Sequence, residues 1–237
     1  VGCYVRHNPW ILRGREWGSF LEVRENAANA YCAAYKREAA WARRTQGAFT
    51  IFCSSATDPF VPQERKFGVT RRLLEAMHLH PPDTLILQTH SHRVLDAADV
   101  IVSLAQCCRV RVHVSIETDR ETLPDMPSPA SSIARRLQAC AALRRHGIFT
   151  VVTVAPLLPI DDVDRFFQRL SDVADAVVID HFIEGDGTAD GSRTFRTTLP
   201  AVMAAIDPDS VTLAYRDRIV AAARRSLPQR VGIGSSG

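Results

Sequence analysis

The chain has 237 residues, of which 46% are hydrophobic and 23% are charged, and its formal net charge is +3. It is long enough for one large domain with a buried core. No run approaches the ~20 apolar residues of a membrane helix, so we expect a soluble, cytoplasmic protein without a membrane partner. Its scattered cysteines do not indicate a disulfide framework, and its mild positive charge neither requires nor excludes nucleic acid.

Helices and short apolar runs alternate along the chain. The first predicted helix covers residues 27 to 45, with Asn26 as its N-cap. A later helix begins after Ser132 and ends in basic residues before Gly147, and another opens at Asp161 and Asp162. Runs typical of buried strands cover residues 48 to 54, 84 to 90, 109 to 115, 148 to 156 and 176 to 182.

This alternation predicts an α/β fold of parallel strands joined by right-handed crossovers. Both an open doubly wound sheet and a full or partial barrel of βα units fit, and periodicity does not choose between them. In either architecture the functional residues lie at the carboxyl ends of the strands. We therefore look for a site in the residues that directly follow each apolar run.

Two of these strand ends leave alternatives open. Asp58, in the segment SATDP, either caps a turn or belongs to a binding site. His90 and His92 form an H-x-H pattern whose side chains point to one face of an extended chain. With Asp180 and His181 as further ligands, this pattern would suit a zinc-type hydrolase, although so short a pattern arises more often by chance.

Several segments together resemble a known family, which none of them indicates alone. They are Cys3-Tyr4, the eight-residue segment TDPFVPQE from Thr57 to Glu64, Thr89-His90-Ser91, Val114-Ser115-Ile116 and Ala155-Pro156. In this order they resemble the landmarks of radical S-adenosylmethionine (SAM) proteins of the spore photoproduct lyase and DNA repair photolyase group. The resemblance covers essentially the whole chain, and the eight-residue segment is its most specific part.

The resemblance implies a partial (β/α) TIM-type barrel, with residues 1–237 as a single radical SAM core domain truncated at both ends. Cys3 would be the third cysteine of a CxxxCxxC loop that holds a 4Fe-4S cluster. The first strand and the other two cluster ligands would then precede Val1, and we expect a cysteine directly before it. The chain alone would be inactive.

The resemblance also implies a SAM-binding site, in which the cofactor would start radical chemistry on a substrate. Tyr4 would pack by the cluster, and Ala155 would bring backbone close to the adenine. His90 stands where relatives often carry lysine, and Ser115 would contact the SAM carboxylate or ribose. The residues expected beside the methionyl amino group are Ser54, Ser55, Thr57 and Asp58.

The substrate is not indicated by the sequence. The family labels suggest nucleic-acid repair, so DNA is a possible partner, but no basic patch supports it. The paired arginines lie in several separate predicted helices: Arg43-Arg44, Arg71-Arg72, Arg135-Arg136 and Arg224-Arg225. A barrel that has lost its cluster and serves only to bind remains the third alternative.

Overall fold

A computed structural model of the chain describes residues 9–53 and 57–234. Its centre is a sheet of six strands in the order β1-β2-β3-β4-β5-β6, and each neighbouring pair is parallel. The strands are β1 (Thr50–Cys53), β2 (Thr84–Thr89), β3 (Arg109–Ser115), β4 (Phe149–Val154), β5 (Ala176–Ile179) and β6 (Val231–Ile233). A strand order that follows the chain is that of a βα barrel, whereas a doubly wound sheet reverses its order. The sheet does not close, so the prediction of a partial barrel is confirmed.

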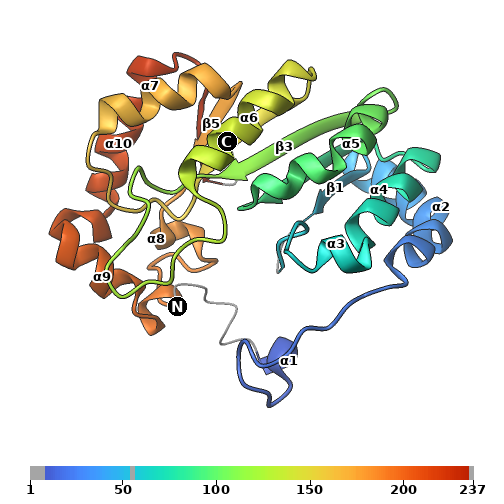
Figure 1. Cartoon of the computed structure of the whole chain (residues 1–237), viewed down its shortest axis with the longest axis horizontal. Helices are drawn as coiled ribbons and strands as arrows, with labels where there is room; N and C mark the ends of the chain where they lie inside the picture. Colours follow the sequence, from blue (N-terminus) through green and yellow to red (C-terminus); the bar gives the residue numbers. More distant parts are fainter. Residues whose placement is uncertain (1–8, 54–56, 235–237) are drawn as a thin grey trace.

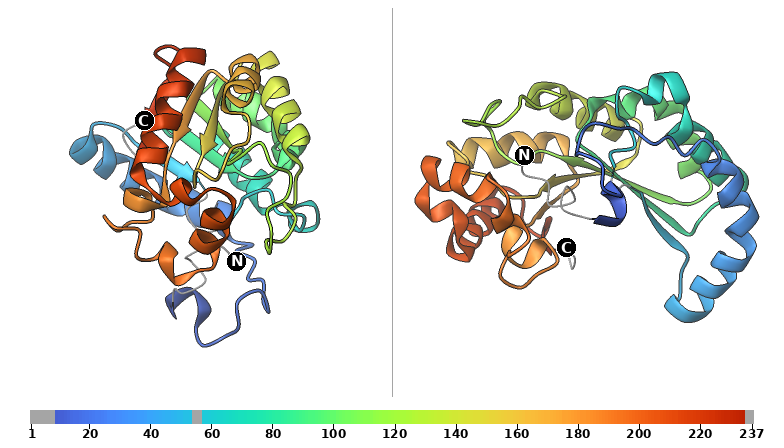
Figure 2. Two further views of the ribbon diagram at one scale, coloured as in Figure 1. Left: turned by 90° about the vertical axis from the view of Figure 1, so that its left-hand side faces the viewer. Right: turned by 90° about the horizontal axis from the view of Figure 1, so that it is seen from below.

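Most of the longer helices cover the outer side of the curved sheet, and the first short helix lies apart from it (Figures 1 and 2). The longer ones are α2 (Ala27–Gln46), α4 (Val69–Leu79), α5 (Ala98–Ala105), α6 (Ile133–Arg145), α7 (Val163–Val173), α9 (Leu199–Ile206) and α10 (Leu213–Ser226). The shorter ones are α1 (Pro9–Leu12), α3 (Glu64–Phe67), η2 (His92–Ala97), α8 (Phe182–Gly185), η3 (Thr194–Arg196) and η4 (Pro208–Val211). In the part of the chain that the structure describes, no helix is long and apolar enough to cross a membrane.

Several helix ends carry the capping residues that the sequence predicts. The side chains of Ser132 and Asp162 accept hydrogen bonds from backbone N–H groups in the first turns of α6 and α7. Gly147 has φ 76°, the left-handed conformation expected after α6. Asn26 is an exception to the prediction, because its side chain makes no capping hydrogen bond although it stands at the N-cap position of α2.

The core lies between the sheet and the helices. Alternate side chains of β2 and β3 are completely or almost completely buried against the helices, among them Leu85, Leu87, Val112 and Val114. Because side chains alternate along a strand, the residues between them face the inner side of the barrel. One row of paired residues on the inner side consists of Phe52, Ile86, Arg111 and Phe149.

The inner side of the sheet is more polar than the outer side. Gln88, His113, Ser115 and Thr153 belong to its rows. Near the amino ends of the strands it is open, since Phe52 and Phe149 are 50% and 45% exposed. The helix-facing core thus holds the fold together, while the inner face carries the polar side chains.

Tyr215 on α10 connects the helical layer to the loop after β4, and its ring is buried. Its hydroxyl accepts a hydrogen bond from Ile160 N (3.0 Å) and donates one to Leu158 O (3.3 Å). We expect Tyr215→Phe to lower the free energy of unfolding by about 1 to 2 kcal/mol, because it leaves a partly buried N–H without its partner. Urea unfolding measures this loss, and Tyr35→Phe, at a less buried hydroxyl, should cost less. Equal costs in the two variants would contradict the role given to Tyr215.

Candidate functional site

The carboxyl ends of the strands form the mouth of the partial barrel. His90 directly follows β2, Ala155 follows β4 and Asp180 follows β5, while Glu117 comes two residues after β3. The strand register places these residues on the inner side of the barrel: His90 is level with the row that contains Ser115 and Thr153, and Glu117, Ala155 and Asp180 lie one step beyond that row. A ring of charged and small residues therefore lines the mouth.

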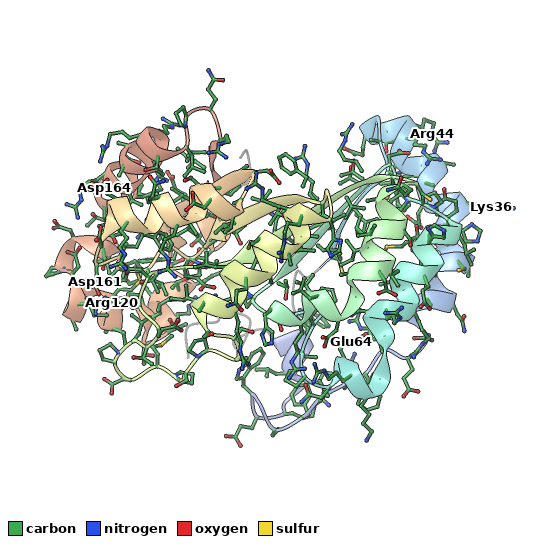
Figure 3. The ribbon with its side chains drawn as sticks, turned by 45° about the horizontal axis from the view of Figure 1, so that its top comes forward. Lys36, Arg44, Glu64, Arg120, Asp161 and Asp164 are labelled. Atoms are coloured by element: carbon green, nitrogen blue, oxygen red, sulfur yellow. The ribbon has the colours of Figure 1, made fainter. Side chains whose placement is uncertain are left out.

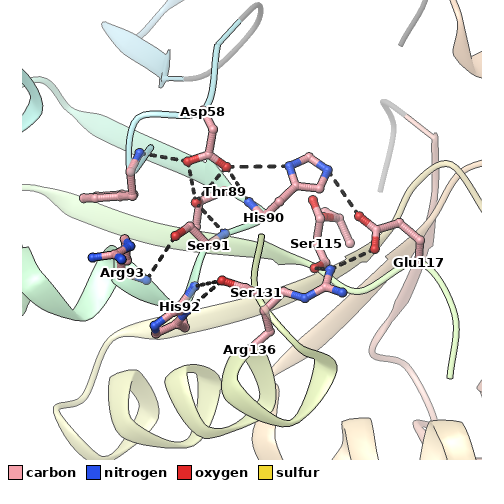
Figure 4. A network of polar contacts seen from close by, with 12 residues as sticks. Asp58, Thr89, His90, Ser91, His92, Arg93, Ser115, Glu117, Ser131 and Arg136 are labelled. Carbon is pink, nitrogen blue, oxygen red and sulfur yellow. Dashed lines mark hydrogen bonds and ion pairs between the residues drawn. The ribbon is translucent and has the colours of Figure 1, made fainter. Parts of the chain in front are cut away.

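Asp58 links the loop after β1 to the end of β2 (Figure 4). Its carboxylate accepts hydrogen bonds from Phe60 N (2.8 Å), Thr89 Oγ1 (2.8 Å) and His90 N (2.6 Å). Burial alone would raise the pKa of Asp58, but hydrogen bonds from His90, Phe60 and Thr89 outweigh it and lower the pKa. Of the two roles that the sequence left open, the structure shows the turn-capping one, extended by the bonds to β2.

His90 lies between two carboxylates. Its Nδ1 is 3.7 Å from Asp58 Oδ2, and its Nε2 is 3.2 Å from Glu117 Oε1. Partial burial acts to lower the pKa of His90, but the two carboxylates outweigh it and raise the pKa to about 10. The ring is therefore a cation at neutral pH. Because the side chain remains 56% exposed, this cation is accessible from the mouth.

Glu117 is held from its other side by Arg136 of α6. Arg136 donates from one guanidinium nitrogen to Glu117 Oε2 (2.8 Å) and to the carbonyl of Ser115 (2.6 Å). Burial would raise the pKa of Glu117, but His90 and Arg136 outweigh it and lower the pKa to about 2. Asp58, His90, Glu117 and Arg136 thus form one chain of alternating charges, which we call the mouth network.

Glu117 and Arg136 are the members of the mouth network that the sequence analysis missed. The signal was present, because Glu117 stands two residues after Ser115 and so shares its face of the chain. Arg136 could not be found in the same way. It lies in a pair of arginines on a predicted helix, and only the packing of α6 shows that Arg136 is buried while Arg135 is exposed.

The other predicted SAM-binding residues are distributed unevenly. Thr57 lies exposed beside Asp58, and Ala155 lies half-buried at the mouth. Ser115 is fully buried, and its hydroxyl shares a hydrogen bond with Thr153 Oγ1 (2.9 Å), so it does not reach the surface of the mouth. The remaining predicted positions lie outside the described residues, namely Cys3, Tyr4, Ser54 and Ser55.

The H-x-H prediction of a shared metal site is wrong for the described part of the chain. The ring of His92 turns away from His90, and its Nδ1 lies 2.6 Å from Ser131 Oγ. The physical reason is that β2 ends at Thr89 and a 3-10 helix starts at His92, so the extended alternation does not continue. Among residues 9–53 and 57–234 no group of three or more His, Cys, Asp or Glu side chains could hold a metal ion.

The four arginine pairs of the sequence lie on four separate helices, α2, α4, α6 and α10. In Figure 3, Lys36 and Arg44 project from α2 at one end of the molecule, and Arg120 and Asp161 lie at the other. One member of each arginine pair forms an ion pair with a nearby carboxylate: Arg43 with Asp83, Arg71 with Asp99, Arg136 with Glu117 and Arg225 with Asp164. One arginine of each pair is thus held by a carboxylate of the fold.

No family model and no curated protein matches the sequence. Among solved structures, the chain is similar to a double mutant of spore photoproduct lyase with bound AdoMet and dinucleoside spore photoproduct. The TM-score is 0.61 at 12% identity, over 98% of this chain and 72% of that chain. Spore photoproduct lyase complexed with dinucleoside spore photoproduct is similar over the same shares, with a TM-score of 0.59 and 13% identity. The chain thus has the fold of spore photoproduct lyase, as its sequence motifs predicted.

Proposed function

We propose that this chain is the SAM-binding barrel of a radical SAM enzyme and that SAM lies across the mouth of the barrel. The observation that carries the proposal is the similarity to a structure of spore photoproduct lyase that contains AdoMet, which extends over 98% of this chain. The mouth network supports it independently, because it presents an exposed cation at the carboxyl ends of the strands, where barrels of this kind place their sites.

The residues at the mouth fit the chemistry of SAM. The amino acid end of SAM carries a carboxylate, which the protonated ring of His90 can attract. Asp58 and Glu117 hold that ring in place and keep it charged, so we assign them as positioning residues. Thr57 and the backbone at Ala155 are within the same mouth, where they would contact the ligand. When bound to a reduced 4Fe-4S cluster, SAM supplies hydrogen-atom abstraction.

The cluster itself is assigned to Cys3, which lies outside the described residues. We propose that Cys3 is a cluster ligand, with Tyr4 packed beside it, because the motif order along the chain is that of the radical SAM loop. Iron and sulfide measured in the anaerobically reconstituted protein test this assignment. Both should disappear in Cys3→Ala. Retention of iron in that variant would contradict the assignment.

Replacement of His90 tests the SAM site directly. We expect His90→Gln to weaken SAM binding by about 10- to 150-fold, the equivalent of ~1.5 to 3 kcal/mol for hydrogen bonds to a charged group. Isothermal titration of the chain with SAM measures the change. His92→Gln is the matched control, since His92 lies two residues away but bonds to Ser131, and it should bind SAM as the wild type does. Equal affinity for SAM in wild type, His90→Gln and His92→Gln would show that His90 does not contact SAM.

For the substrate we propose a chemical class. The similar solved structures contain a dinucleoside photoproduct, so a dinucleotide lesion is the first candidate for this chain. The arginine pairs lie on separate helices and each has one member in an ion pair, which favours a short substrate in the mouth over a long duplex bound along a basic face. Binding of a dinucleoside photoproduct, compared with an undamaged dinucleotide, measures this preference.

A further inference from the structure

A cleft of about 370 Å³ lies where α3, α4 and η2 meet. Sites for small molecules occupy about 300 to 1,000 Å³, so the cleft has room for a small ligand. The residues that line it include the apolar Phe60 and Val61 and the charged Arg65, Arg93 and Asp96. We call it the Arg93 cleft.

The Arg93 cleft shares a wall with the mouth network. Phe60 N donates a hydrogen bond to Asp58 Oδ1 (2.8 Å), and Arg93 N donates one to the hydroxyl of Ser91 (3.2 Å). In Figure 4 the side chain of Arg93 lies on the other side of Ser91 from His90. A ligand in the cleft would therefore lie beside the proposed SAM site without occupying it.

Arg93 lacks a full set of hydrogen-bond acceptors. Asp96 Oδ2 lies 3.0 Å from Arg65 Nε and 3.8 Å from Arg93 Nη1, so one carboxylate is shared by two guanidinium groups. The longer distance is not a hydrogen bond, and Arg93 Nη1 is buried without a hydrogen-bond partner among the described residues. The other acid of the lining, Glu64, already accepts two backbone N–H groups at the start of α4.

An acceptor in the cleft would relieve this deficit, because an unpaired buried donor is unfavourable. The side chain of Arg93 is 26% exposed as a whole, so a ligand can approach its guanidinium group from the cleft. Arg65, with a side chain 64% exposed, provides a second guanidinium group on the same carboxylate. The cleft thus offers two arginines to one ligand.

The surroundings of the cleft are positively charged as well. Burial lowers the pKa of His92, and the charges of Arg135, Arg93 and Arg65 lower it further, while Asp96 opposes them. Three cations and one acid therefore act on this ring. A phosphate group suits such a place, because its several oxygens can accept hydrogen bonds from two planar guanidinium groups at once.

We propose that the Arg93 cleft binds a phosphate group and is a second ligand site, separate from the site for SAM. Free inorganic phosphate and a phosphate ester of the substrate supply the same chemistry. Phe60 and Val61 add an apolar wall, so the cleft can also hold part of a group to which the phosphate is attached. Only the substrate as a source rests on the proposed function, since a nucleotide bound in the mouth would carry that ester.

Inorganic phosphate titrated at constant ionic strength into protein labelled with 15N-arginine tests the site. The Nε–H signals of Arg93 and Arg65 should shift, and that of Arg225 should not. Arg93→Met should weaken phosphate binding by at least about tenfold. Arg225→Met is the matched control, since it removes an arginine that is ion-paired with Asp164 on a distant helix, and it should bind phosphate as the wild type does.

Asp96→Asn separates ligand binding from a structural role of the arginines. It removes the carboxylate that competes with phosphate, so it should strengthen phosphate binding by about two- to fivefold. Arg65→Met, at an exposed side chain, should weaken binding and keeps the test decisive if Arg93→Met does not fold. Equal phosphate affinity in wild type, Arg65→Met and Asp96→Asn would refute the phosphate site.

A thymidine dinucleotide with and without a 5′-phosphate identifies the source of the group. If the substrate supplies it, the 5′-phosphate should strengthen binding to wild type about tenfold, and this difference should vanish in Arg93→Met. If inorganic phosphate binds and the 5′-phosphate adds nothing, the cleft takes free phosphate. If neither binds, the phosphate site is refuted, while titration of wild type with SAM decides separately on the proposed function.

Discussion

Arg136→Met is expected to lower the free energy of unfolding by about 3 kcal/mol at pH 7. Loss of one partner from a buried ion pair costs about 3 to 5 kcal/mol, because the other charge stays buried. We expect a loss of stability at the lower end of this range, since His90 still contacts Glu117 in the variant. Arg136 has a side chain only 5% exposed, and methionine keeps most of its apolar volume. The loss therefore reports the charge and its hydrogen bonds, and urea unfolding measures it.

Two further variants separate the ion pair from general effects of the helix. Arg135→Met changes an exposed neighbour on α6, and we expect its free energy of unfolding to stay within about 0.5 kcal/mol of the wild type. The double variant Arg136→Met with Glu117→Gln should be more stable than Arg136→Met alone, because no uncompensated carboxylate remains. If Arg136→Met and Arg135→Met cost the same, the buried pair does not stabilise the mouth.

The architecture could be predicted because it follows from local patterns. Each apolar run marks a strand, and the helices between them start at Ser132 and Asp162 as their capping side chains indicated. Periodicity did not decide between a doubly wound sheet and a barrel, because strand order depends on how distant segments pair. Asn26 shows a similar limit, since a suitable residue at a helix start does not ensure that its side chain bonds to the backbone.

The segment TDPFVPQE is also explained by the fold that it builds. Its Asp58 ties the loop to Thr89 and His90 at the end of β2. Its last residue, Glu64, accepts hydrogen bonds from Val69 N (3.0 Å) and Arg71 N (3.1 Å), the first turn of α4. Part of the motif thus fixes the geometry of the mouth, and a sequence resemblance alone does not separate that task from ligand contact.

The charge state of His90 could not be predicted from the sequence. A histidine at a position where relatives often carry lysine indicates, from the sequence alone, the loss of a permanent positive charge. The structure restores the charge by placing Asp58 and Glu117 on either side of the ring. In the sequence, Asp58 is 32 positions before His90 and Glu117 is 27 positions after it. Only strand pairing brings the two acids beside the ring, so no local pattern reveals them.

The imidazole of His90 should remain protonated well above neutral pH. Its pKa is raised to about 10, whereas the pKa of His92 is lowered by burial and by nearby arginines. Because the folded pKa of His90 exceeds its unfolded value, its contribution to stability is complete below pH 6.5 and is lost as the pH rises toward 10. NMR titration of labelled histidines, assigned with His90→Gln, measures both values, and titration of His90 near pH 6.5 would contradict the mouth network.

Glu117→Gln measures how much of the raised pKa of His90 comes from the carboxylate of Glu117. An opposite charge within hydrogen-bonding distance moves a pKa by about 1 to 3 units, so the pKa of His90 should fall by that amount in Glu117→Gln. Asp58 keeps the value above that of a free histidine, and the pKa of His92, whose ring bonds to Ser131, should not change. SAM binding should then weaken at pH 9 more than at pH 6, because the variant loses its cation within that interval. An unchanged pKa for His90 in Glu117→Gln would show that the 3.2 Å contact does not hold its proton.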